Sequence, residues 1–210
     1  MLLSRLRMRL ALLVAAMFAL LPLPAQAAVE LTFYTRDLGT QFPHAFVTLV
    51  GTPDRGGERI DTNYGFTATA VTPALLWGAV RGRVEAVGDG YVRASDGHFV
   101  VTLSDSEFDR VMAAAERWRT MDQPSYHLKR RNCVHFIADM AAAIGMTAET
   151  PRNLMRRPRA FAESLIRANR PWLQQRGARI LREPREEREE RRRGGRGRNS
   201  EGGGEDGDGA

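Results

Sequence analysis

The only cysteine of the sequence, Cys133, lies where a helix is expected to begin. Asn132 can cap that helix, because its side chain can accept a hydrogen bond from a free N–H group of the first turn. Apolar residues then follow at helical spacing until Gly145, namely Phe136, Ile137, Met140, Ala141 and Ile144. The helix dipole and the free N–H groups favour an anion there, so the position favours a thiolate. Cys133 is in phase with the apolar residues, so its sulfur should face inward.

Position alone leaves two interpretations of Cys133 open, since a lone cysteine near a helix start is often a small buried hydrophobe. A nucleophilic cysteine needs a base, usually a histidine held by a third polar group. His135 lies about 200° around the helix from Cys133 and should face away from it, and His127 lies in the preceding loop. His44 begins an apolar strand and is the preferred base, whereas His98 follows a Ser-Asp-Gly turn and is expected to face solvent.

The third polar group is expected on the strand that returns beside His44. A hairpin that turns near residues 54–55 would place Asn63, and then Asp61, on the His44 face of the sheet. A register slip of one residue would replace both with Thr62. The backbone N–H group of the cysteine would be one oxyanion donor.

A metal site built from His127, Cys133 and His135 is the least favoured interpretation. The spacing matches no common zinc pattern, and the sequence offers no evident fourth ligand. We therefore expect neither a metal nor another cofactor.

The elements that would position these residues come as strands first and helices afterwards. Alternating and β-rich segments predict strands at 28–36, 44–50, 59–64, 80–87 and 98–103. Ser104 and Glu107 form a capping box for a helix that ends near Thr120, and further helix starts are expected at Thr150-Pro151 and Pro158. This order predicts an α+β fold with an antiparallel sheet packed against helices.

The two ends of the chain differ in composition from the middle. Residues 1–27 have three arginines, an apolar stretch and an Ala-Gln-Ala site, which indicate a cleaved secretory signal, with an uncleaved anchor as the alternative. Residues 174–210 are rich in Arg, Glu and Gly and are expected to be a disordered tail that could contact an anionic envelope surface. Residues 28–173 then form one folded domain of a periplasmic or secreted protein.

Charge does not indicate a nucleic-acid partner. The net charge is +6, and removing a signal that holds three arginines and no acid leaves 6 − 3 = +3. Basic residues are not interleaved with aromatic ones in the folded part, as nucleic-acid binding would require. A single cysteine cannot form an internal disulfide, so an exported chain must bury it, pair it with another chain or use it.

The segment Tyr126-x-Leu128-x-x-x-Asn132-Cys133-x-His135-Phe136 resembles the cysteine motif of circularly permuted papain-like (NlpC/P60-like) proteins. It is similar to the lecithin:retinol acyltransferase-like and the permuted deubiquitinase-like branches. In permuted members the histidine motif precedes the cysteine, and the segment 44–49, His-Ala-Phe-Val-Thr-Leu, fits that order.

The resemblance covers residues 44–50 and 126–137, and implies a permuted papain-like fold with a Cys133 nucleophile and a His44 base. His135 would be a structural part of the motif. The acyltransferase-like branch carries a second histidine on the next strand, where this chain has residues 61–64, Asp-Thr-Asn-Tyr. The third catalytic position and the substrate class therefore stay open.

The expected function is an exported thiol hydrolase or acyltransferase that acts on an amide or ester bond. Its substrate would be a peptide, a cell-wall component or a lipid-derived molecule. The alternative is a catalytically silent domain of the same fold that binds a partner in the envelope.

Overall fold

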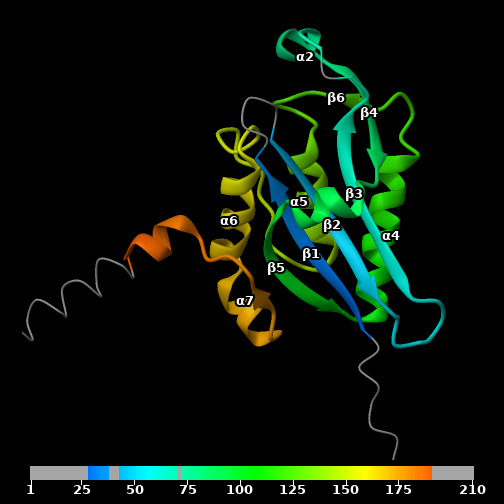
Figure 1. Cartoon of the computed structure of the whole chain (residues 1–210), viewed down its shortest axis with the longest axis vertical. Coiled ribbons are helices and arrows are strands. Elements are labelled where there is room, and N and C mark those ends of the chain that lie inside the picture. Colours follow the sequence, from blue (N-terminus) through cyan, green and yellow to red (C-terminus); the bar gives the residue numbers. More distant parts are fainter. Residues whose placement is uncertain (1–27, 38–42, 71, 191–210) are drawn as a thin grey trace, which may run out of the picture.

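The computed structural model describes residues 28–37, 43–70 and 72–190 (Figure 1). The expected signal at 1–27 and the last part of the expected tail, 191–210, lie outside the described residues.

The fold is α+β, and its centre is a seven-stranded antiparallel sheet with the strand order β6-β4-β3-β2-β1-β5-β7. The strands are β1 (Val29–Arg36), β2 (His44–Gly51), β3 (Ile60–Ala68), β4 (Val80–Glu85), β5 (Asp96–Leu103), β6 (Ser125–Tyr126) and β7 (Arg179–Ile180). Each strand predicted from alternation is present, which confirms the antiparallel α+β plan.

Three helices cover one face of the sheet, which we call the inner face; they are α4 (Asp105–Arg119), α5 (Cys133–Ala143) and α6 (Pro158–Ala168). α5 packs on β2 and β3, α6 packs mainly on β1, and α4 lies against α5 (Figure 1). Both predicted caps are present, since Ser104 forms a capping box with Glu107 and Asn132 caps α5. α6 begins at Pro158 as expected, whereas the expected helix start at Thr150-Pro151 is wrong, because that segment forms turns.

The hydrophobic core lies between the inner face and these helices. Alternate β2 residues enter it, and they join buried side chains from β1, β3, β5 and the three helices. The β2 residues in the core are Ala45, Val47 and Leu49. The other β2 side chains point to the outer face, where Phe46 stacks on Tyr34 and meets Tyr91 of the short helix α3 (Asp89–Arg93).

The β2–β3 hairpin has the predicted register. Thr48 pairs with Asn63, and Val50 pairs with Asp61. Both nominated polar residues therefore lie on the outer face, as His44 does.

The start of the expected tail is part of the fold. Two further short helices are α2 (Ala74–Trp77) and α7 (Arg170–Gln175), and β7 pairs with β5 beyond α7. Two arginines anchor this segment, since Arg182 pairs with Asp96 while Arg170 pairs with Glu183 and Glu187. The prediction that the domain ends at residue 173 missed these long-range contacts.

Within the described ranges, no helix has both the length and the apolar character needed to cross a membrane.

Candidate active site

Asn132 holds the start of α5 with both ends of its side-chain amide. Its Oδ1 accepts hydrogen bonds from the backbone N–H groups of Val134 at 2.9 Å and His135 at 3.4 Å. Its Nδ2 donates to the carbonyl groups of Leu128 and Met155, both at 2.6 Å. The ring of His135 completes the capping box, because its Nδ1 accepts from the N–H group of Asn132 at 3.3 Å.

The sulfur of Cys133 is enclosed at the first residue of α5, with 3% of the residue exposed. The hydroxyl of Tyr126 donates toward Sγ at 3.9 Å. Burial raises the pKa of the Cys133 thiol, and hydrogen bonding from Ala45 N–H, Tyr126 and the N–H groups of Cys133 and Val134 only partly offsets this. The expectation that the helix start favours a thiolate is therefore wrong for the arrangement observed, because desolvation outweighs the donors.

The Ala45 N–H group can reach the sulfur because β2 and β3 separate at this end of the sheet. Their ladder runs from the Val47–Tyr64 pair to the Gly51–Ile60 pair. From Gly65 onward β3 pairs with β4 instead. The first residues of β2 thus lie beyond the end of the β2–β3 ladder, and β2 packs against α5.

Among the residues that the structure describes, no hydrogen bond joins His44 to Cys133, and the His44 ring packs on the outer face of the sheet. Ala45 enters the inner core, while the ring of His44 stacks over Phe46 with 6.2 Å between ring centroids and 14° between planes. His44 Nε2 would lie 2.7 Å from a Cβ added to Gly65, so the glycine makes room for the ring. Burial lowers the pKa of His44 to about 4, so the imidazole is neutral at pH 7.

Asn63 shares a face with His44 but its side chain binds another segment. Its Oδ1 accepts from the N–H group of Val87 at 2.7 Å, and its Nδ2 donates to the Val87 carbonyl at 2.9 Å. Asn63 and Asp61 line an outer-face pocket of about 240 Å³ beside Tyr34. Asn63 therefore holds the connection after β4, and the structure does not assemble the predicted triad.

His98 is fully buried, contrary to the prediction that it faces solvent. A bulge displaces it, because Phe33 pairs with Phe99 while the next residue, Tyr34, pairs with Gly97. His98 Nε2 lies 2.7 Å from Oγ1 of the buried Thr35. Burial, and then the nearby arginines 159 and 182, lower the pKa of His98 to about 4. His98 is therefore a buried histidine that the sequence pattern had placed at the surface.

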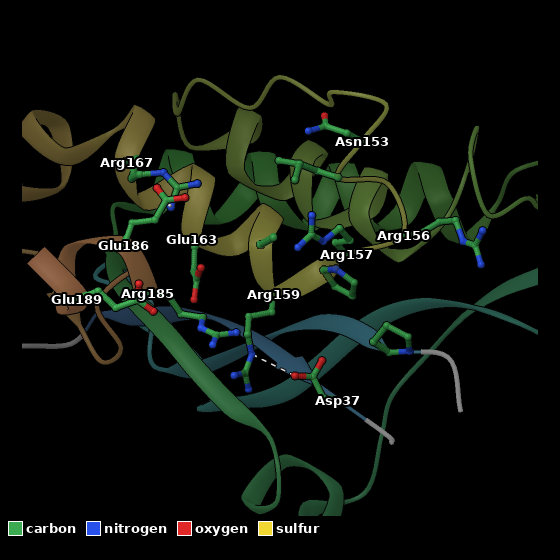
Figure 2. Close-up of a pocket in the computed structure, with 14 residues that line it drawn as sticks. Asp37, Asn153, Arg156, Arg157, Arg159, Glu163, Arg167, Arg185, Glu186 and Glu189 are labelled. Atoms are coloured by element: carbon green, nitrogen blue, oxygen red, sulfur yellow. Dashed lines mark ion pairs between the residues drawn. The ribbon is translucent and has the colours of Figure 1, made fainter. Parts of the chain in front are cut away.

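A cavity of about 80 Å³ adjoins the sulfur; its lining includes Cys133, Tyr126 and Pro43. It shares Pro43, Arg156 and Pro158 with a larger pocket of about 720 Å³ (Figure 2). A molecule in the larger pocket would thus lie next to the cysteine cavity.

The residues of the disfavoured metal site have other contacts. His127 Nδ1 accepts from the N–H group of Lys129, and His135 belongs to the helix cap. In the described parts of the chain, no group of three or more His, Cys, Asp or Glu residues could hold a metal ion.

We expect iodoacetamide to alkylate folded Cys133 with an apparent pKa above the value of about 8.5 for a free thiol, because burial raises the Cys133 pKa. Tyr126→Phe should raise it further by removing a donor that stabilises the thiolate. The alkylation rate between pH 6 and 10 can be followed by intact mass spectrometry, with the denatured protein as the control. An apparent pKa below the free value would contradict this expectation.

Comparisons of the chain with protein-family models, with curated proteins and with solved structures found no match. The chemistry of the site therefore rests on the residues described above.

Proposed function

We propose that the protein is an exported thiol hydrolase or acyltransferase with Cys133 as its nucleophile and a permuted papain-like fold. The observation that carries the proposal is a sulfur enclosed at the first residue of a capped helix, beside a cavity of about 80 Å³. The hydroxyl of Tyr126 donates toward this sulfur at 3.9 Å. The cysteine helix packs on the strand that begins with His44, which fits the order implied by the resemblance.

In the proposed reaction, His44 takes the thiol proton and the thiolate attacks the carbonyl carbon of an amide or ester. The tetrahedral oxyanion accepts a hydrogen bond from the backbone N–H group of Cys133. Collapse breaks the bond to the amine or alcohol, which leaves with the proton from His44. Water or another acceptor then attacks the thioester, loses a proton to His44 and releases Cys133. The substrate is a peptide, a cell-wall component or a lipid-derived molecule.

The observed arrangement is the resting state in this proposal. His44 is the first residue of β2, next to Ala45, whose N–H group reaches the sulfur. In the active arrangement the ring leaves its place against Gly65 and turns toward the start of α5. The thiol then gains the base that it lacks at rest.

The test is covalent trapping of the acyl group. Activated esters and amides of short acyl chains and of amino acids are incubated with the folded protein, and the product is measured by intact mass and peptide mapping. We expect an adduct on Cys133 and none on Cys133→Ala. His44→Ala should slow acylation by about 10²–10⁴-fold, the usual contribution of a general base.

His127→Ala is the matched control, because His127 lies in the preceding loop and its Nδ1 accepts from Lys129. It should acylate like the wild type. Equal rates for the wild type and His44→Ala, or no adduct with any substrate, would rule out the Cys–His pair.

A second candidate is a catalytically silent domain that binds an envelope component. Its support is the 3% exposure of Cys133 together with the position of His44 on the outer face. In that case Cys133→Ala should bind isolated cell-wall material or anionic vesicles as the wild type does, while the wild type forms no acyl adduct.

A further inference from the structure

The larger pocket lies on the side of the molecule where α6 begins (Figure 2). It is lined by the first turns of α6, by the turn segment 153–157 and by residues 185–189. Its volume of about 720 Å³ is within the usual range for small-molecule sites, roughly 300–1,000 Å³.

Glu163 supplies a buried carboxylate to this pocket. The residue is 6% exposed, and Figure 2 shows its side chain directed into the pocket. Within the described ranges, its Oε1 has no hydrogen-bond partner. A buried carboxylate oxygen without a donor is costly, so the site favours a ligand that brings an ammonium or another donor.

Cationic groups at the start of α6 favour an anion in the same pocket. Arg159 is paired with Asp37 at 3.2 Å and with Asp96. Arg157 and Arg185 also line the pocket, and neither has an ion-pair partner among the residues that the structure describes. Guanidinium groups bind carboxylates and phosphates in bidentate geometry.

The first turn of α6 adds to this anion preference. The residue at its N-cap position, Arg157, makes no side-chain cap, so the helix start keeps free backbone N–H groups. These groups and the helix dipole both favour a negative charge.

We infer that this pocket binds a small zwitterion, with its primary ammonium at Glu163 and its carboxylate or phosphate at Arg157, Arg185 and the start of α6. Pro158 and Glu163 are five residues apart on α6, which is about 7.5 Å along the axis at 1.5 Å per residue. The two charged groups of the ligand should therefore be several bonds apart. A dipeptide and a phosphoethanolamine group both meet this condition. Binding does not require the thiol of Cys133.

The test is calorimetric titration of the purified protein with matched probes. Glycylglycine carries both charges, N-acetylglycylglycine carries only the anion, and glycylglycinamide carries only the cation. O-phosphoethanolamine replaces the carboxylate with a phosphate. We expect one of the two zwitterions to bind at least tenfold more tightly than either single-charge probe. Tighter binding of glycylglycine would indicate a peptide ligand, and tighter binding of O-phosphoethanolamine would indicate a lipid headgroup.

Substitutions test which side chain binds each charged group of the ligand. Glu163→Gln should weaken zwitterion binding about tenfold and remove the preference over the acetylated probe, and Arg185→Gln should weaken binding of the anionic probes. The matched controls are Glu116→Gln and Arg117→Gln, which are exposed on α4 and should bind normally. Cys133→Ala should also bind normally, so loss of catalysis and loss of this site are distinguishable.

Zwitterions that bind no more tightly than single-charge probes would overturn the inference, and so would unchanged binding in Glu163→Gln. Thermal melting checks that each variant folds. If Glu163→Gln does not fold, the probe comparison in the wild type and the exposed Arg185→Gln variant still decide.

Discussion

Asn132→Ala is expected to lower the free energy of unfolding by about 4 kcal/mol. The substitution removes the cap of α5, which is worth about 0.5–2 kcal/mol. It also leaves the carbonyl groups of Leu128 and Met155 without the Nδ2 donor of a residue that is 2% exposed. Each buried group that loses its partner costs about 1–3 kcal/mol. Urea unfolding followed by tryptophan fluorescence measures the loss.

Two further variants separate the parts of this effect. Asn132→Ser keeps an acceptor for the helix start but no donor for Leu128 and Met155, so it should fall between the wild type and Asn132→Ala. Ser104→Ala removes the cap of α4 and should cost only about 1 kcal/mol. If Asn132→Ala costs no more than Ser104→Ala, the two donor bonds contribute little.

The same substitution bears on Cys133, because the cap fixes the turn that encloses the sulfur. Fraying of α5 would expose the thiol and reduce the desolvation that raises its pKa. We therefore expect faster alkylation of Cys133 in Asn132→Ala under native conditions. The cap of α5 thus also keeps the reactivity of the thiol low.

Local patterns in the sequence were sufficient to predict the hairpin and both capped helices. The turn near residues 54–55 fixed the register, and the Thr48–Asn63 pair follows from it. Asn132 was identified as a cap from its neighbours alone. Its bond to the Met155 carbonyl joins residues 23 positions apart, and nothing in the local sequence indicates such a contact.

The face of His44 was not predictable from alternation. Phe46 on the outer face is as fully buried as Ala45 and Val47 on the inner face, so β2 is a nearly continuous apolar run. A strand that is buried on both faces carries no period-two signal. The decisive residue is Gly65, which leaves space for the imidazole, and its effect depends on the three-dimensional pairing.

His98 and the segment after residue 173 were misassigned for a related reason. The bulge between Phe33 and Tyr34 changes which way β5 side chains point, and no turn signal marks it. β7 is only two residues long and is fixed by distant ion pairs such as Arg182 with Asp96. In both cases a long-range contact overrides the local composition.

Acid should destabilise the protein through His98, by about 3 kcal/mol when the pH falls from 7 to 4. Its pKa is lowered from 6.5 to about 4 in the folded state, chiefly by burial. The unfolded chain therefore binds a proton between these pH values that the folded chain does not. The contribution of His98 to stability is fully present above pH 6.5 and is lost as the pH falls toward 4, at about 1.36 kcal/mol per pKa unit. His44 acts in the same direction, since burial also lowers its pKa to about 4.

His98→Gln isolates this contribution, because the amide can still bond to Thr35 Oγ1 but does not titrate. Urea unfolding at pH 7 and at pH 4 should show a loss of stability about 3 kcal/mol smaller in the variant than in the wild type. The carboxylate of Asp96 and its two arginine partners, Arg159 and Arg182, are present in both proteins. Their contribution cancels in the difference, so equal losses in the two proteins would mean that His98 is charged or exposed in the folded state. A smaller loss in the variant would show that the folded state holds His98 as a neutral imidazole, because burial at the β5 bulge disfavours its charged form.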